Sequence, residues 1–536
     1  MSSTSESIQY RPLKAPRSHG SVLLEPGLAR YAEEILANRR LFQAAEEVLV
    51  DDLPLPEFRR LARRNLLETA CRHTWSYLRP FPLPETDVPL ILSGHQPALY
   101  HPGVWFKNFV AGSLAQQTAG LAVHVIADSD VAALPSVLVP TGEADDLTRV
   151  RVAYDDPGER LAWEMTGTQN MPLLRSFADR VKATLPVEHR DTLLESYWPE
   201  VLRQIDQGNR PGLAFSKARH QLEAAWGNRS LEVPLGQLCG TEGFFRFTLH
   251  LLRNLPRLHL AYNESVRAYR GTHHIRSTSH PVPCLEEVGA TLEAPLWVWT
   301  DAEPHRRRLL VRQVGDHLEL SDQEGWHVEI PGEGEAAVRA LRRLAEEGVY
   351  LRPKALLTTM YMRMALADGF IHGIGGAKYD QVTDSILARF FGLTAPGFQV
   401  ATSTVHLPLP TEETPVLSVQ EVESQLRDLR FNPDRYLAVE ARLRPGVSGL
   451  LETKRDLLAE VPEKAEKIAW HQRLMEVNRQ FEPLVGQAES RLLVLLAEAG
   501  AAAERQAVRE FREYPWSLYP EQTLRSLLLD LSHDAA

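Results

Sequence analysis

Cysteine is scarce in this sequence: its 536 residues include three, Cys71, Cys239 and Cys284. No two of them form a CxxC pair, so neither a disulfide framework nor a cysteine-based zinc site is indicated. This cysteine usage favours a reducing compartment.

Long apolar runs and an excess of basic charge are also lacking. The best apolar stretch, Leu492–Leu496, is much shorter than the roughly 20 residues of a membrane helix, and Met1–Gln9 lacks the apolar centre of a signal peptide. The 59 basic and 70 acidic residues leave a net charge of −11, which argues against a nucleic-acid-binding surface. We therefore expect a cytoplasmic protein whose partners are neither membranes nor nucleic acids.

The pattern of the chain changes several times along its length, which suggests several domains or sub-domains. We expect six segments: a helical N-terminal lead-in (1–86), the first part of a core (87–270), a small β-rich insertion (271–333), the second part of the core (334–410), an antiparallel helical arm (411–510), and a C-terminal tail that packs on the core (511–536).

The core begins with a strand–helix–strand pattern. Val88–Leu92 is a short apolar run typical of a strand buried on both faces. Val104–Gln117 has helical spacing, and Leu121–Ala127 is a second strand. This βαβ unit predicts a Rossmann-like parallel sheet, and we expect Leu231–Gly236 and Leu258–Ala261 to be further strands.

The insertion and the arm have different periods. Alternating apolar residues in Leu296–Trp299 and Leu309–Val314 predict a small antiparallel sheet. Further on, alternating three- and four-residue steps predict a heptad seam at Trp470, Leu474, Val477, Phe481, Leu484, Ala488 and Leu495. Val419–Leu429 is the expected returning helix, which gives a coiled-coil-like arm through which the chain would form a homodimer. The alternative is a helix packed on its own domain.

The first candidate site loops follow the strands of the βαβ unit, at the edge where open parallel sheets bind ligands. His95, Gln96, Lys107 and Asn108 follow the first strand or lie on its helix, and Asp128-Ser129-Asp130 follows the second. This density of donors and acceptors indicates a polar site. Alternatively, the histidines are turn residues and the aspartates cap the next segment.

The second candidate loop is His372-Gly373-Ile374-Gly375-Gly376-Ala377-Lys378-Tyr379-Asp380, between an apolar strand and a helical pattern. Glycines at such a position let backbone N–H groups approach an anion at the positive end of the helix. Lys378 in the first turn fits a carboxylate or phosphate ligand. Upstream, Lys354 and Arg363 could add positive charge, although Arg363 could also lie on a solvated helix face. The alternative for the loop is a tight turn.

A metal site has little support from spacing. His273-His274 with His280, or His95 with His101 and Asp128, could in principle bind a metal, but no HExxH pattern is present. We predict no metal, and a metal-assisted hydrolase stays an alternative.

These motifs together resemble one family. Leu92-Ser93-Gly94-His95-Gln96-Pro97 with Val125-Ile126-Ala127-Asp128-Ser129-Asp130 is similar to the Gly-Gln-Gln loop and Glu-Asp-His-Asp segment of the cysteine ligases of bacillithiol biosynthesis. Leu351-Arg352-Pro353-Lys354-Ala355-Leu356-Leu357 and Gly375-Gly376 resemble that family's Ser-Pro-Asn-Val-Leu-Leu stretch and Gly-Gly-Pro-Gly-Glu loop. The resemblance implies a ligase that joins cysteine to an amino-sugar malate conjugate, on a fold that can hold ATP or ADP.

The sequence departs from the family pattern at the motifs themselves. His95 replaces the first Gln, and Ala377-Lys378-Tyr379 replaces Pro-Gly-Glu, so a base replaces an acid. We expect a related pocket with a more anionic ligand: an enzyme of ligase or transferase type acting on a small anionic metabolite. Gly375, Gly376, Lys378 and Lys354 or Arg363 would hold the anion, with Gln96, Lys107, Asn108, His372, Tyr379 and Asp380 beside it. Asp128 or Asp130 would orient or deprotonate an amine, and His95 would carry the proton. A non-catalytic binding or assembly protein is the main alternative.

Overall fold

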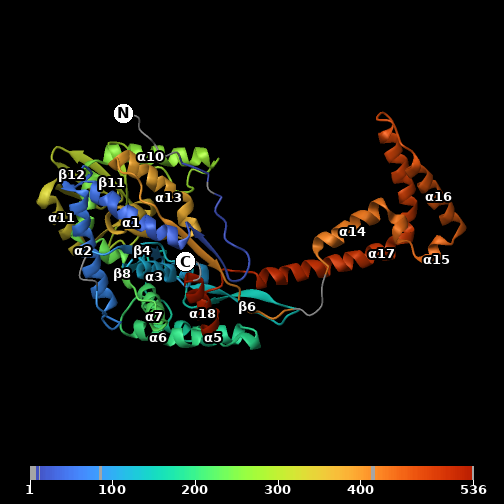
Figure 1. Cartoon of the computed structure of the whole chain (residues 1–536), viewed down its shortest axis with the longest axis horizontal. Helices are drawn as coiled ribbons and strands as arrows, with labels where there is room; N and C mark the ends of the chain where they lie inside the picture. Colours follow the sequence, from blue (N-terminus) through green and yellow to red (C-terminus); the bar gives the residue numbers. More distant parts are fainter. Residues whose placement is uncertain (1–7, 11, 84–86, 412–416, 534–536) are drawn as a thin grey trace.

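A computed structural model of the chain describes residues 8–10, 12–83, 87–411 and 417–533. Met1–Ser7, which belong to the stretch examined for a signal peptide, lie outside the described residues. The chain folds into a large α/β body from which a helical arm projects (Figure 1). Within the described residues, no helix combines the length and apolar character needed to cross a membrane.

The body is built on a six-stranded, mostly parallel sheet. Its strand order is β1-β16-β15-β4-β5-β8, and only β1, at one edge, runs antiparallel to its neighbour. The strands span Ser21–Glu25 (β1), Gln399–Thr404 (β16), Gly369–His372 (β15), Leu90–His95 (β4), Leu121–Ile126 (β5) and Leu231–Pro234 (β8). The predicted α/β class with a parallel sheet is confirmed.

Two crossover helices leave the middle of this sheet in opposite directions. α3 (Pro102–Gln117) leads from β4 to β5, whereas α13 (Ile374–Ile386) leads from β15 to β16. Because such crossovers are right-handed, the two helices cover opposite faces. Phe106 of α3 packs in one hydrophobic cluster with Ile91, and Val382 of α13 packs in the other with Leu92. The strand order therefore reverses between β4 and β15, which is where open α/β sheets bind ligands.

The lead-in and one predicted strand differ from expectation. The lead-in supplies α1 (Leu28–Ala44) and α2 (Leu55–Thr74), but it also supplies the edge strand β1. The strand predicted at Leu258–Ala261 is wrong, because these residues lie inside α10 (Leu255–Thr272). The buried residues Leu255, Leu258, Tyr262, Val266 and Tyr269 of this helix follow the helical period, which a four-residue window does not reveal.

The predicted antiparallel sheet is present and larger than expected. Its order is β13-β12-β11-β10-β14, with the short β9 also paired to β10. The strands span Glu287–Val288 (β9), Thr291–Thr300 (β10), Arg307–Val314 (β11), His317–Ser321 (β12), His327–Pro331 (β13) and Val349–Pro353 (β14), with α11 (Gly334–Glu346) between the last two. β14, which follows the boundary expected at residue 333, pairs with β10 from Leu296↔Pro353 to Thr300↔Val349.

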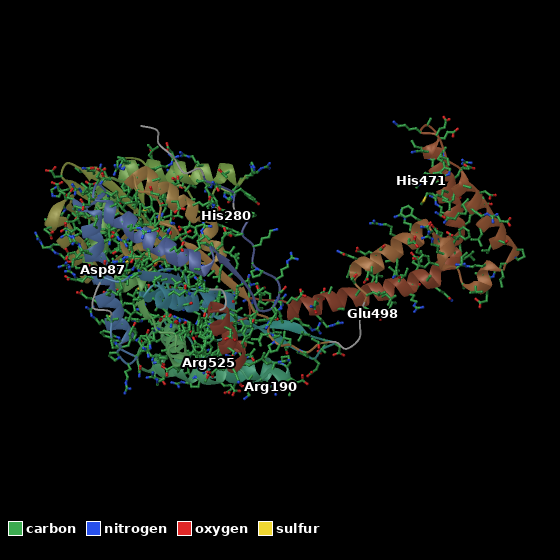
Figure 2. The ribbon with its side chains drawn as sticks, viewed as in Figure 1. Asp87, Arg190, His280, His471, Glu498 and Arg525 are labelled. Carbon is green, nitrogen blue, oxygen red and sulfur yellow. The ribbon has the colours of Figure 1, made fainter. Side chains whose placement is uncertain are left out.

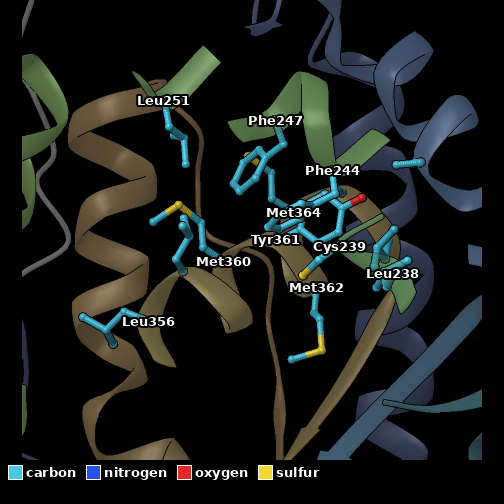
Figure 3. Packing of buried hydrophobic residues seen from close by; sticks show 14 of the residues in the cluster. Leu238, Cys239, Phe244, Phe247, Leu251, Leu356, Met360, Tyr361, Met362 and Met364 are labelled. Atoms are coloured by element: carbon cyan, nitrogen blue, oxygen red, sulfur yellow. The ribbon is translucent and has the colours of Figure 1, made fainter. Parts of the chain in front are cut away.

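The remaining elements of the body surround these sheets. β6 (Ser136–Thr141) and β7 (Thr148–Ala153) form a separate hairpin. The helices are α4 (Met171–Arg175), α5 (Phe177–Thr184), α6 (Leu194–Asp206), α7 (Pro211–Ala225), α8 (Leu235–Leu238), α9 (Glu242–Arg253), α12 (Ala355–Tyr361) and α18 (Glu521–His533). Figure 3 shows α9 packed against the core, where the rings of Phe244 and Phe247 contact the ring of Tyr361.

The arm consists of α14 (Val419–Phe431), α15 (Val439–Arg442), α16 (Pro445–Ala459) and α17 (Lys467–Arg509). The predicted returning segment lies in α14, and Val422 and Leu429 of this helix share a hydrophobic cluster with Phe481 and Val485 of α17. The arm carries His471 and Glu498 away from the body (Figure 2). The tail after α17 packs on the body, where Tyr514, Trp516 and Tyr519 are buried.

Candidate functional site

A cleft of about 790 Å³ lies at the carboxyl ends of the parallel strands, over the point where the strand order reverses. Residues that follow β4, β5 and β15 line it together with Thr402 of β16. Trp297, Arg306 and Pro353 of the antiparallel sheet form one wall, and Arg512 from the tail lies in another part of the lining. The two candidate loops, far apart in the chain, therefore share one cavity, as predicted.

The structure divides the predicted site residues into two groups. The cleft is lined by His95, Gln96, Lys107, Asp130, Gly375, Gly376, Lys378 and Tyr379. The side chains that stand outside the lining are Asn108, Asp128, Lys354, Arg363, His372 and Asp380.

The amino end of α13 opens into the cleft without a side-chain cap. Among the described residues, the N–H groups of Ile374, Gly375 and Gly376 have no hydrogen-bond partner. A Cβ on Gly376 would lie 2.7 Å from Nδ1 of His372, whereas a Cβ on Gly375 would meet nothing within 4 Å. The free donors and the positive end of the helix form a place for an anion, and Lys378 lies in the next turn.

Lys107 lies in the cleft lining with only 4% of its surface exposed. Its Nζ donates to the carbonyl oxygen of Gly94 at 2.8 Å, and within the described part of the chain no carboxylate forms an ion pair with it. Burial lowers the pKa of Lys107 to about 8. A buried ammonium with one neutral partner is costly, so an anionic ligand would stabilise it.

His95 is a neutral base in the same lining. Its Nδ1 lies 3.1 Å from the carbonyl oxygen of Gln96, and because a carbonyl can only accept, Nδ1 must carry the proton. The other nitrogen, Nε2, then has a free lone pair. Burial and the charge of Lys107 lower the pKa of His95 to about 3, so the ring is uncharged at neutral pH.

The two predicted acids differ in their surroundings. Asp130 lines the cleft but is held on both oxygens: Gln96 Nε2 donates to it at 2.6 Å and Arg306 Nη1 at 3.1 Å. It thus connects the β4 loop with the antiparallel sheet. Asp128 lies outside the lining, where it accepts from the N–H of Gly236 at 2.8 Å. Burial and the charge of Glu164 raise the pKa of Asp128 to about 8, so it is mostly protonated at neutral pH.

Arg363 is not a solvated residue, because only 1% of it is exposed. It lies in a π-helical turn, Met362–Leu366, and pairs with Asp380 and with Asp384 at 2.7 Å. Asp380 also accepts from Nε2 of His372 at 2.7 Å. Burial by itself would raise the pKa of Asp380, but the charges of Arg363 and His372 and the hydrogen bonds to the carboxylate together outweigh it, and the pKa stays below its usual value. This buried set holds α13 against β15 from behind the cleft.

Lys354 and Asn108 also have structural partners. Lys354 forms an ion pair with Glu293 of β10. Asn108 accepts from Ser93 Oγ at 3.3 Å and donates to Glu223 at 2.9 Å. Both side chains support the strands around the cleft, and neither reaches its lining.

Three cations of the lining were not among the predicted site residues: Lys14, Arg306 and Arg512. The Arg306–Arg308 run is visible in the sequence, but only pairing with Asp130 brings its first member to the cleft. Lys14 and Arg512 lie in irregular segments without a motif, so no local signal could have identified them.

The lining thus contains five basic side chains and two acidic ones, Asp130 and Glu513, in a chain whose net charge is −11. Within the described residues, no group of three or more His, Cys, Asp or Glu side chains is arranged to hold a metal ion. Compared with known proteins, the chain matches no family model and no curated protein.

Proposed function

We propose that this protein is an enzyme of ligase or transferase type that acts on a small anionic metabolite. The observation that carries the proposal is the excess of unpaired positive charge in a cleft at the sheet's reversal point. The excess is local, because the molecule as a whole carries a net charge of −11.

The anion would lie between the free N–H groups of α13, Lys378 and Lys107. Charge-assisted hydrogen bonds of this kind are short and strong. With its anion bound, the charge of Lys107 is offset, so the pKa of His95 rises. His95 Nε2 can then accept a proton from a nucleophile, such as an amine, that meets the second substrate in the cleft.

The resemblance to the cysteine ligases suggests the reaction to test first. In it, ATP would activate the carboxyl group of cysteine as an acyl phosphate or acyl adenylate. The amine of an amino-sugar malate conjugate would attack the carboxyl carbon, lose a proton and displace phosphate or AMP, which forms the amide bond. The negatively charged malate portion matches the cations of the cleft. The exchange of Pro-Gly-Glu for Ala377-Lys378-Tyr379 favours a ligand more anionic than that of the family.

The test begins with binding. Isothermal titration of the full chain with citrate, phosphate and ATP should identify a binding anion, and Lys378→Ala should weaken its binding about tenfold, the loss of one charge-assisted contact. Lys464→Ala, an exposed lysine of the arm, is the matched control. Mass spectrometry would then follow product formation from the conjugate, cysteine and ATP. Unchanged binding in Lys378→Ala would contradict the proposal.

The second candidate function is a non-catalytic binding or assembly protein, which one observation favours. The arm projects from the body (Figure 1), and Val461, Ile468, Leu493 and Val494 expose apolar surface on it. Since α14 already covers the heptad seam of α17, we propose that a homodimer would use this second, exposed surface. A binding protein would bind the anion in the titration and form no product.

A further inference from the structure

A second group of donors lies where β16 borders the cleft, which we call the β16 end. Arg512, in the segment that follows α17, lines this end together with Lys14 and His101. Arg512 is anchored on β16: its Nη2 donates to Thr402 Oγ1 and to the carbonyl oxygen of Ser403, each at 2.9 Å. The buried Tyr514 and Trp516 fix the segment next to it.

The guanidinium of Arg512 is incompletely satisfied. Its Nε is buried and has no hydrogen-bond partner among the described residues. No described carboxylate lies within ion-pair distance of it, and burial lowers its pKa, which the neighbouring charge of Glu513 offsets only in part. A partly buried cation without a counter-charge is costly, so an anion that pairs with the guanidinium would stabilise it.

His101 adds a donor at the same place. The backbone N–H of Gly103 donates to its Nδ1 at 3.1 Å, so in the neutral ring the proton is on Nε2. Burial, with the charges of Arg512 and Lys107, lowers the pKa of His101 to about 4, and the ring is therefore neutral. Arg512, His101 and the exposed Lys14 all offer hydrogens, against the single carboxylate of Glu513.

We propose that the β16 end is a second anionic subsite, and that the cleft takes one ligand with two separated anionic groups. The first group would occupy the site between α13 and Lys107, so the inference rests on the proposed function. Lys107 donates to Gly94 of β4 and Arg512 donates to Ser403 of β16. Because β15 lies between these two strands, the two cations lie roughly 10 Å apart. A single phosphate or carboxylate cannot span them.

Hexanoate and adipate test this directly, because they have the same six carbons and differ in one carboxylate. Titration calorimetry of the full chain should show adipate binding at least about tenfold more tightly than hexanoate, the effect of one added charge-assisted contact. Arg512→Gln should remove this preference and leave the affinity for hexanoate unchanged. Arg525→Gln, an exposed arginine of the same C-terminal region (Figure 2), should change neither.

Lys14→Gln is the second variant, since Lys14 is exposed and its loss does not threaten folding. It should lower the affinity for adipate a fewfold, again without affecting hexanoate. Two bound hexanoates in the wild type would show that the β16 end takes a separate ligand, which would overturn the proposal of one ligand with two anionic groups. Equal affinity for the two probes, undetectable binding of adipate at millimolar concentration, or a preference that survives in Arg512→Gln would overturn the inference. Lys107→Met tests the first subsite, on which the proposed function depends. It should weaken the binding of hexanoate and of adipate by the same factor, whereas Arg512→Gln should weaken only the binding of adipate.

Discussion

At the scale of one residue, the buried charge of Lys107 lowers the stability of the ligand-free protein and favours the binding of an anion. Its burial without a counter-charge is unfavourable until an anion arrives. We predict that Lys107→Met stabilises the ligand-free protein by about 1–3 kcal/mol while weakening anion binding at least about tenfold. Urea unfolding and titration with the anion identified by calorimetry measure the two effects. A less stable variant with unchanged anion affinity would contradict this account.

The same residue gives the binding site a pH dependence. Because the pKa of Lys107 is about 8, its charge is lost as the pH rises through that value, and anion affinity should fall above pH 8. The unfolded chain keeps its lysine protonated up to about pH 10.4, so it binds more protons between these values and stability should rise across this window. Titrations from pH 6 to 9.5 check the first effect, and Lys107→Met should remove both.

At the scale of one helix, the paired glycines of α13 provide a matched comparison. A Cβ at Gly376 would meet His372 Nδ1 at 2.7 Å, while Gly375 faces open space. We predict that Gly376→Ala destabilises the protein by about 1–3 kcal/mol and weakens anion binding, because His372 must move. Gly375→Ala should change stability by less than about 1 kcal/mol. Unfolding curves of the two variants measure the change in the free energy of unfolding. Equal changes would contradict the predicted clash between a Cβ at Gly376 and His372.

The arm is the second element whose packing can be tested alone. Phe481 of α17 is fully buried against α14, so Phe481→Ala should destabilise the arm by about 3–5 kcal/mol. The cleft is built from other elements and should keep its anion affinity. Hydrogen exchange resolved along the chain would show faster exchange in the helices of the arm alone. Loss of protection in the body as well would mean that arm and body unfold together.

At the scale of the whole molecule, the proposed homodimer depends on contacts between two chains, so it is tested by measuring the oligomeric state. Leu493 and Val494 are exposed neighbours on α17, and exposed apolar surface can mark an association site. The double variant Leu493→Glu, Val494→Glu should sediment as a monomer in analytical ultracentrifugation, where the wild type sediments as a dimer. A wild type that is monomeric at all concentrations would contradict the dimer.

The sequence by itself determined the elements with strong local periodicity. The βαβ unit from Val88 to Ala127, the alternating strands of the insertion and the long helix with its returning partner follow from side-chain patterns of two or three to four residues. The site loops could also be predicted, because glycines and polar residues directly follow buried strands. Parallel topology then brings His95 and Lys378 to one edge.

Only the tertiary structure decided which polar residues face the cleft. Arg363, Asp380 and Lys354 look like ligand-binding residues in the sequence, yet each is buried against a partner from another element. Lys14 and Arg512 come from irregular segments more than 490 positions apart in the numbering, and both reach the same cavity. The same holds for β14, which joins the antiparallel sheet through its pairing with β10. Local sequence determines the tendency of a segment to form a helix, strand or turn. Ion pairs, strand partners and burial depend instead on contacts between segments that are distant in the chain.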